Sequence, residues 1–345
     1  MINSPAAISY QKWGEHAGQP VHLFRLGNST GAYVELCNYG ATLVSAMMPD
    51  GEGNLGNVVL GYPSLAGYLK DECYLGATIG RFANRIGGAA VELDGNAYQL
   101  QANDGGNTNH GGWDGFNSKV FANEVGEDNV TFIYRSPDGE GGFPGNLELS
   151  VTYRFTDDNE LRIHFNAVTD RATIANFTNH AYFNLAAKPG NILGHKLKVR
   201  AQNMLDTDAA HIPTGLIKPT GSKAWSGDTV GSKMNDDPHV NAGFNYCYLL
   251  ESTDTLKYAA ELTDDTSGRR LEVTTTYPSV MVYTGDYLSS NCEGNFGRPY
   301  QPLDGLCLEC QYYPDSPNHA HFPSTVLKPG EEYDHTIVYK FGVIN

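Results

Sequence analysis

The sequence predicts an all-β protein, one large antiparallel β-sandwich with few short helices, and three observations support this. Residues 147–155 alternate between apolar and polar side chains, and residues 161–167 repeat the pattern after the turn Asp157-Asp-Asn. The 39 Gly, 17 Pro, 21 Tyr and 14 Phe suit a chain of many turns and half-buried strands. No convincing amphipathic helix exceeds about two turns, which argues against a parallel α/β fold.

The other elements are short and follow from apolar runs bounded by turn residues. The segment Gly27-Asn-Ser-Thr-Gly separates two apolar runs, and Asp94-Gly-Asn separates two more, so each predicts a hairpin. A single helical turn is expected at 65–70, and residues 206–245 read as mostly loop. Further strands are expected at 21–26, 33–38, 38–49, 57–60, 90–93, 97–100, 195–200, 258–262, 270–275 and 333–343. No repeat or compositional shift marks a linker, so we expect one domain over residues 1–345.

Charge and cysteine content narrow the partners and the compartment. The formal charge of −16 argues against nucleic acid and anionic membrane, which require basic patches. No run of about 18 apolar residues is present, and Met1–Ala7 lacks the basic and apolar regions of a signal peptide. The six Cys are sparse and read as free thiols in a reducing compartment. We therefore expect a cytoplasmic protein.

Residues 176–185 are the first candidate for a functional site. Their alternation is nearly that of a strand, and one face would carry Asn, Thr, His, Tyr and Asn without any charge. Such a face is suited to hydrogen-bonding a small hydroxylated molecule. His180 is the candidate for proton transfer, and a packed histidine bonded to a backbone carbonyl is the alternative.

Glu309 is the second candidate, on a strand expected over 306–312. Cys307 and Gln311 share its face, so the carboxylate has no obviously solvated surroundings. Desolvation would raise its pKa towards values useful for a general base. A salt bridge to an arginine is the alternative interpretation.

The remaining candidates are polar groups that suit a neutral polyol. Arg85 offers a fork of fixed donors for neighbouring hydroxyls, and Asn245 and Tyr182 offer hydrogen bonds. His110 and Trp113 lie in the Asn/Gly-rich loop 103–117, which we interpret as a binding loop. Trp113, Tyr182 and Phe183 are candidate apolar faces for a sugar ring.

No metal or cofactor is expected. The thiols of Cys307-Leu-Glu-Cys310 face opposite sides of a strand, and His319-Ala-His321 has no apparent third ligand. No nucleotide-binding or Gly-x-Ser-x-Gly motif occurs.

The chain resembles the aldose 1-epimerases (galactose mutarotases) over nearly its whole length. The resemblance rests on several separated motifs, which are specific in this order: Asn38-Tyr-Gly-Ala-Thr-Leu, Gly80-Arg-Phe-Ala-Asn-Arg-Ile, Asn109-His-Gly-Gly-Trp-Asp-Gly-Phe, Asn179-His-Ala-Tyr-Phe-Asn-Leu, Ile212-Pro-Thr-Gly, Val282-Tyr-Thr-Gly and Leu327-Lys-Pro-Gly-Glu-Glu-Tyr. It implies a large antiparallel sandwich without a cofactor, a monosaccharide substrate, and interconversion of the α and β anomers of free aldoses.

The resemblance also implies roles for individual residues. Glu309 looks like the general base, His180 like the general acid and His110 like a second active-site histidine. The sugar contacts would come from Asn84, Arg85 and Tyr182.

Two positions depart from the family pattern. Asn245 stands where an active-site Asp is expected, and Met281 stands where a Gln is expected. Both changes remove polar contacts to the sugar, so we expect altered specificity, for another hexose or a pentose. A non-catalytic sugar-binding or sensing protein is the alternative, although a binder needs neither an acid nor a base. A glycoside-cleaving enzyme would need two carboxylates, and Glu309 has no evident partner. A monomer or a homodimer is equally compatible with the sequence.

Overall fold

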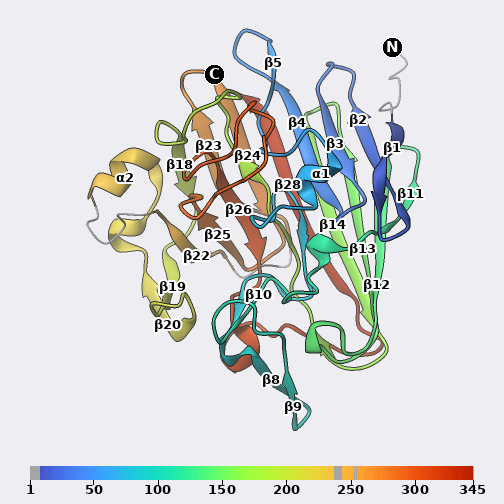
Figure 1. Ribbon diagram of the computed structural model, residues 1–345. Helices are drawn as coiled ribbons and strands as arrows, with labels where there is room; N and C mark the ends of the chain where they lie inside the picture. The colour runs from blue at the N-terminus through green and yellow to red at the C-terminus, as the bar shows by residue number, and fades with distance from the viewer. Residues whose placement is uncertain (1–7, 237–242, 252, 254, 345) are drawn as a thin grey trace.

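The computed structural model describes residues 8–236, 243–251, 253 and 255–344, and its main chain is organised as antiparallel sheets (Figure 1). A nine-stranded sheet has the order β11 (Ala122–Val125), β12 (Asn129–Ser136), β13 (Leu147–Phe155), β14 (Glu160–Thr169), β28 (Tyr333–Val343), β24 (Arg269–Thr275), β23 (Lys257–Asp264), β18 (Lys196–Val199) and β21 (Ser226–Thr229). A five-stranded sheet comprises β1 (Ile8–His16), β2 (Gln19–Gly27), β3 (Tyr33–Cys37), β4 (Thr42–Pro49) and β5 (Leu55–Asn57). The predicted all-β sandwich is confirmed.

A six-stranded sheet carries one wall of the site. Its order is β17 (Tyr182–Phe183), β26 (Leu306–Gln311), β25 (Ser279–Tyr283), β22 (Asn245–Leu249), β19 (Asn203–Thr207) and β20 (Pro213–Pro219). Two-stranded pairs complete the fold: β6 (Thr78–Ile79) with β16 (Thr178–Asn179), β7 (Arg85–Ile86) with β10 (Thr108–Asn109), β8 (Ala90–Leu93) with β9 (Asn96–Gln99), and β15 (Thr173–Ile174) with β27 (Val326–Leu327). The α-helices among the described residues are α1 (Leu65–Tyr68) and α2 (Val230–Asp236).

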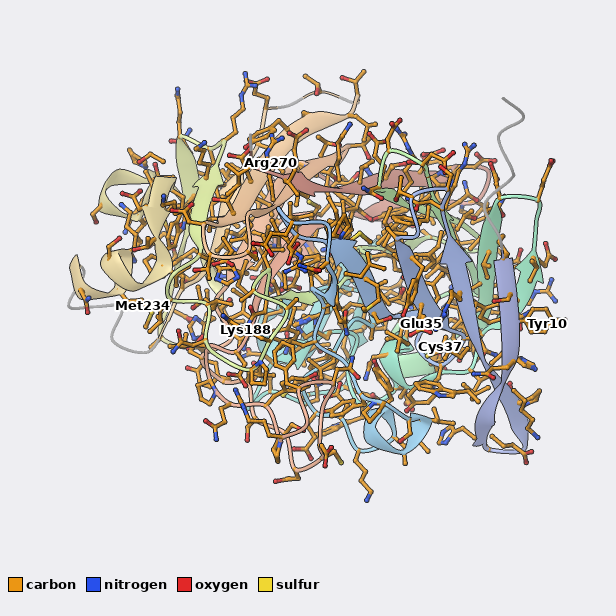
Figure 2. The ribbon with its side chains drawn as sticks, turned by 90° about the horizontal axis from the view of Figure 1, so that it is seen from above. Tyr10, Glu35, Cys37, Lys188, Met234 and Arg270 are labelled. Carbon is orange, nitrogen blue, oxygen red and sulfur yellow. The ribbon has the colours of Figure 1, made fainter. Side chains whose placement is uncertain are left out.

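The main core lies between the sheets. The apolar side chains of β13 and β14 alternate with polar ones as the sequence predicts, and their inward-facing members are fully buried. Seen from above, side chains fill the space between the layers, with Tyr10 on β1 and Met234 on α2 at opposite ends of the molecule (Figure 2). Burial of these aromatic and branched side chains supplies the main stabilisation of the fold.

Most expected strands are present, and β28 and β8 have the predicted bounds. The expectation of a mostly irregular segment over 206–245 was wrong, because β20, β21 and α2 lie within it. β20 pairs with β19 across a short turn, and β21 pairs with the more distant β18. These strands carry little periodicity of their own. The strand expected at 57–60 ends at Asn57, and Val59 makes only an isolated bridge to Phe183.

The segment 176–185 also differs from its prediction. It forms two short strands, β16 and β17, which pair with different partners and are interrupted at His180. Every residue of the segment is buried, so it has no solvated face. The apolar side chains of the segment pack in the main core, whereas its polar side chains lie in a second buried environment. His180, at the interruption between the two strands, lines a cavity.

None of the helices in the described ranges has the length and apolar character needed to cross a membrane. The N-terminal residues Met1–Ala7, on which the absence of a signal peptide was judged, lie outside the described residues.

Candidate active site

A cavity of about 610 Å³ opens where β7, β10 and the β16–β17 break meet one end of the six-stranded sheet. That volume accommodates a monosaccharide. Seven of the residues expected from the sequence to act in the site line it: Asn84, Arg85, His110, His180, Tyr182, Asn245 and Glu309. The structure therefore brings together groups that lie up to 225 positions apart in the chain (84 to 309).

Strand register places Glu309 on the sheet face that lines the cavity. In β26, Cys307 lies opposite Tyr182 on one side and Tyr283 on the other, and Tyr283 in turn lies opposite Asn245. Directly opposed residues share a face, as do residues two apart in one strand. Glu309 consequently points the same way as Tyr182 and Asn245, and Met281 is its direct neighbour on β25.

The Glu309 carboxyl is unusual in its environment. Its side chain is 3% exposed, and its Oε2 has no hydrogen-bond partner among the described residues. Burial raises the pKa of Glu309 to about 8, opposed only in part by the positive charge of Arg85. Met281 beside it belongs to an apolar cluster and supplies no amide donor. The carboxyl is thus held in a form that can take or release a proton near neutral pH.

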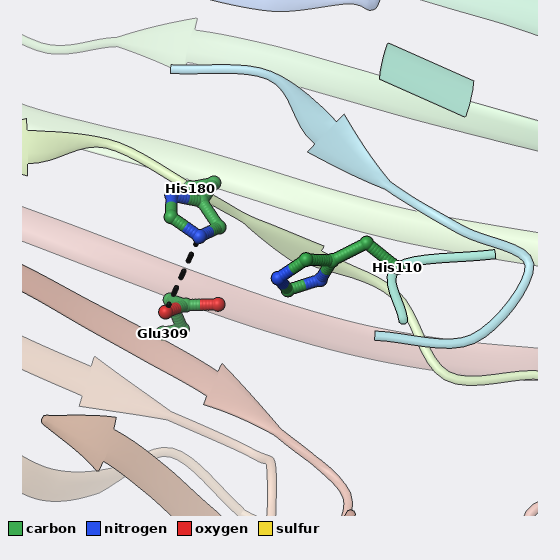
Figure 3. A group of neighbouring side chains, drawn as sticks. All are labelled: His110, His180 and Glu309. Carbon is green, nitrogen blue, oxygen red and sulfur yellow. Dashed lines mark ion pairs between the residues drawn. The ribbon is translucent and has the colours of Figure 1, made fainter. Parts of the chain in front are cut away.

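His180 faces this carboxyl directly (Figure 3). Its Nε2 lies 3.7 Å from Oε1 of Glu309, and its Nδ1 lies 3.6 Å from Sγ of Cys307. Burial lowers the pKa of His180 to about 4. Between these two pKa values the His180–Glu309 pair holds one proton in total, and a low-dielectric site favours the uncharged arrangement with that proton on Glu309.

His110 approaches the pair from the Asn/Gly-rich loop. Its backbone N–H donates to the carbonyl of Asn84, and the backbone N–H of Asn84 donates to Nδ1 of His110 at 3.2 Å. Nδ1 is therefore an acceptor, so in the neutral ring Nε2 carries the hydrogen. Burial, with His180 and Arg85 nearby, lowers the pKa of His110 well below its usual range. The ring, 5.2 Å from that of His180, presents a neutral N–H donor.

Arg85 is fixed by an ion pair at the edge of the cavity. Its Nε lies 2.7 Å from Oδ2 of Asp104, and Oδ1 of Asn84 accepts the Arg85 backbone N–H at 2.8 Å. Asp104 belongs to the loop that carries His110, and it lines the cavity too. Five residues of the loop 103–117 besides His110 line the cavity, Asp104, Gly105, Gly106, Asn107 and Asn109, and its role as a binding loop stays a prediction.

Two of the three proposed aromatic platforms do not reach the cavity. Trp113 is 71% exposed and is not among the lining residues, and Phe183 is buried in the main core. Tyr182 does line the cavity. Tyr74, which was not among the residues expected from the sequence, contacts the rings of both His110 and His180, at 4.7 and 5.7 Å between centroids. Its φ of +60° is rare for an aromatic residue, and no local sequence signal marks it.

Other lining residues were missed as well: Glu72, Cys73, Ala209, Ala210, His211, Tyr283 and Tyr287.

One group of side chains has the donor set of a metal site. His110, His180 and Glu309 each offer a ligand atom, and these atoms lie within 4.8 Å of one another. Two neutral imidazoles and a carboxylate would suit a divalent cation only after Glu309 lost its proton. His319 and His321 instead contact the carbonyl oxygens of Pro213 and Gly215, so they secure β20 as structural residues. Cys307 and Cys310 are free and buried, as their opposite orientation in the strand requires.

Comparison with known proteins decides the family. The family model for aldose 1-epimerase matches residues 22–340. The chain belongs to the aldose 1-epimerase family. It is 40% identical over 313 residues to the galactose mutarotase of Bos taurus, which covers 90% of this chain and 91% of that protein. The resemblance drawn from the sequence motifs is confirmed, and with it the assignment to an enzyme family of isomerases.

Other relatives agree over comparable lengths. Identity to the galactose mutarotase of Homo sapiens is 38% over 98% of this chain and 99% of that one. Identity to the aldose 1-epimerase of Escherichia coli K12 is 36% over 94% and 96%. The crystal structure of galactose 1-epimerase from Lactobacillus acidophilus superposes with a TM-score of 0.86 at 27% identity, covering 99% of this chain and 100% of that chain.

Proposed function

We propose that this aldose 1-epimerase interconverts the α and β anomers of a free aldose, with Glu309 as the base and His180 as the acid. The observation that carries the proposal is the buried pair of these two side chains, 3.7 Å apart, on the wall of a cavity of monosaccharide size. His110 would donate its Nε2 hydrogen to the sugar. Asn84, Arg85, Tyr182 and Asn245 would contact its hydroxyls.

The proposed reaction needs only proton transfers. Glu309 takes the proton of the C1 hydroxyl, the C1–O5 bond breaks, and O5 receives a proton from His180 while C1 becomes an aldehyde carbon. Rotation about C1–C2 then presents the other aldehyde face. O5 attacks it and returns its proton to His180, and Glu309 gives its proton back to O1. Each positioned transfer contributes on the order of 10²–10⁴ in rate.

The perturbed pKa values have a role in this scheme. Ring opening converts an ionised pair, His180 protonated and Glu309 deprotonated, into an uncharged pair. Burial raises the pKa of Glu309 and lowers that of His180, so it favours the uncharged pair that accompanies the open-chain sugar. In the free site the uncharged pair is therefore the favoured form, and the ionised pair that starts ring opening must first form by movement of the proton from Glu309 to His180. From that ionised pair, burial makes the proton transfers of ring opening favourable.

The sugar itself is part of the proposal. Mammalian relatives carry the name galactose mutarotase, and free hexoses are the natural first candidates. Asn245 and Met281 replace the Asp and Gln expected from the family pattern, and both lie on the Glu309 face of the sheet. We propose that these changes shift the preference away from galactose, towards another hexose or a pentose.

Polarimetry of freshly dissolved single anomers tests the function and the preference together. The panel would include D-galactose, D-glucose, D-xylose and L-arabinose. The wild type should accelerate mutarotation of at least one sugar, with galactose not the best. Galactose turned over as fast as the best sugar would contradict the altered preference, and no acceleration of any aldose would contradict the function.

We also propose a single domain, a cytoplasmic location, and a monomer or homodimer that acts without a cofactor. A single domain over residues 1–345 is supported by a core cluster that draws on residues from Phe24 to Phe341. A cytoplasmic location is supported by six cysteines that are all free. A monomer or homodimer acting without a cofactor would be tested by light scattering and by activity after exhaustive chelation.

A further inference from the structure

Asp286 is a carboxylate for which the catalytic scheme above has no use. It follows Thr284-Gly285, at the end of β25 beyond Tyr283. Its Oδ1 is inaccessible to solvent and has no hydrogen-bond partner among the described residues. No ion pair involving Asp286 is found among the described residues either. Oδ1 itself is out of a ligand's reach, so a ligand can meet this carboxylate only through the part of the side chain that lines a cavity.

Hydrogen bonds hold Asp286 beside the strand that carries Asn245. Thr284 accepts the backbone N–H of Phe244 on its Oγ1 at 2.7 Å, and the backbone N–H of Thr284 donates to the carbonyl of Phe244. A Cβ built on Gly243 would lie 2.7 Å from Cβ and 2.8 Å from Cγ of Asp286. Only glycine at 243 leaves room for the Asp286 side chain in this position.

Asp286 lines a second cavity, of about 640 Å³, that adjoins the catalytic one. Four residues line both cavities: Ala209, His211, Asn245 and Tyr287. The two hollows are therefore neighbours across Asn245, on the side of the catalytic cavity away from β26. The boundary at Asn245 is one of the sides of the catalytic cavity that the remote groups of a molecule at Glu309 can meet.

The other charges of the second cavity already have partners. Lys218 pairs with Asp206 at 2.7 Å, and Nζ of Lys223 donates to the hydroxyl of Tyr246 and lies over its ring. Tyr287, 67% exposed, offers an apolar ring at the boundary. A free carboxylate acceptor beside an amide and an exposed aromatic ring is the combination that recognises sugar hydroxyls.

We propose that Asp286 is a substrate-binding residue that accepts a hydrogen bond from a sugar hydroxyl remote from C1, next to Asn245. This inference rests on the proposed epimerase function. Asp286 would then supply a carboxylate next to Asn245, where the side chain of Asn245 is an amide. Asp286 would contribute to binding in the ring-closed and open forms alike, and so would affect KM rather than kcat.

The test compares Asp286→Asn with the exchange variant Asn245→Asp/Asp286→Asn, using Asp94→Asn in the exposed β8–β9 turn as a matched control. A hydrogen bond to a charged acceptor corresponds to roughly a 10- to 100-fold effect on affinity. Asp286→Asn should raise KM for the best hexose by that factor and leave kcat within about threefold. The exchange variant should recover most of the loss, because it returns a carboxylate to the shared boundary.

A deoxy sugar gives the second arm. For the wild type, KM should be higher for one of the 3-, 4- and 6-deoxy derivatives than for the parent hexose, because that derivative lacks the hydroxyl bound by Asp286. The Asp286→Asn substitution should not raise KM for that derivative any further. Unchanged KM in Asp286→Asn, or equal losses for every deoxy sugar, would overturn the proposal. A fall in kcat matching that in kcat/KM would also overturn it.

Calorimetric titration with the same sugar measures binding independently of turnover. It therefore distinguishes a failure of the role proposed for Asp286 from a failure of the proposed epimerase function. If the wild type binds the sugar without epimerising it, the proposed epimerase function is wrong. The ratio of the dissociation constants of Asp286→Asn and wild type still decides the role of Asp286.

Discussion

Glu309→Gln should make the protein more stable at alkaline pH while removing its activity. The carboxyl is 3% exposed, and burial raises its pKa from 4.5 to about 8. Between those values the folded protein binds a proton that the unfolded chain has released. The stability supplied by this group is therefore full below about pH 4.5 and is lost as the pH rises through about 8.

The magnitude follows from the shift. Each pH unit in that window costs about 1.4 kcal/mol of unfolding free energy, so the loss from pH 5 to pH 8 is about 4 kcal/mol. The amide introduced by the Glu309→Gln substitution carries its own cost of about 1–3 kcal/mol, since Oε2 of Glu309 has no donor nearby among the described residues. That cost does not change with pH. The variant should therefore be slightly less stable than wild type at pH 5 and more stable by about 1–3 kcal/mol at pH 8.

Denaturant unfolding of both proteins at half-unit intervals from pH 5 to pH 8 measures this directly. Subtracting the free energy of unfolding of the wild type from that of the variant cancels the contribution of every other group that titrates alike in the two proteins. A difference that rises by several kcal/mol across the range supports a buried, protonated Glu309. A difference that stays constant with pH would refute the reasoning, because Glu309 would then titrate alike in the folded and unfolded states.

Three further predictions concern the reaction. Burial lowers the pKa of His180 to about 4 and raises that of Glu309 to about 8, so kcat/KM should be level between those pH values and fall on both sides. A value of kcat/KM that keeps rising above pH 8 would contradict a pair that holds one proton. Met281→Gln would place an amide opposite Glu309 and lower its pKa, so the alkaline limb of the pH profile should move down by about one unit, whereas the matched apolar change Met281→Leu should leave it in place. Asp104→Asn would release the Arg85 fork held at 2.7 Å and should raise KM about 3- to 30-fold with little change in kcat; an unchanged KM would show that the ion pair does not position Arg85 for the sugar.

The sequence predicted the strand that carries Glu309 better than the walls of the cavity around it. In β26, alternation alone placed Cys307, Glu309 and Gln311 on one face and flagged a carboxylate without solvated neighbours, and all three are buried there. Strand periodicity carries this information because one face of a strand is specified by every second residue. The same rule failed for 176–185, because the chain changes its pairing partner at His180 and local alternation does not record partners.

Tertiary packing also decides which of two similar side chains reaches the cavity. Arg81 and Arg85 stand four positions apart in one motif, and only the second lines the cavity. The guanidinium of Arg81 is buried and donates to the carbonyl oxygens of Ser136, Pro137, Pro144 and Gly145. Nothing local in the sequence separates the two roles. Tyr74 and Asp286 were missed for the same reason, since their surroundings come from distant segments.

The role proposed for Glu309 is the proton transfer that exchanges anomers. Its most direct test is the polarimetric rate for a freshly dissolved α-anomer of the best sugar, measured for wild type, Glu309→Gln and the control Glu124→Gln on the exposed face of β11. Wild type and Glu124→Gln should accelerate mutarotation equally, and Glu309→Gln should fall to the spontaneous rate or within a few per cent of it. A folded Glu309→Gln protein that keeps most of the wild-type rate would contradict the claim.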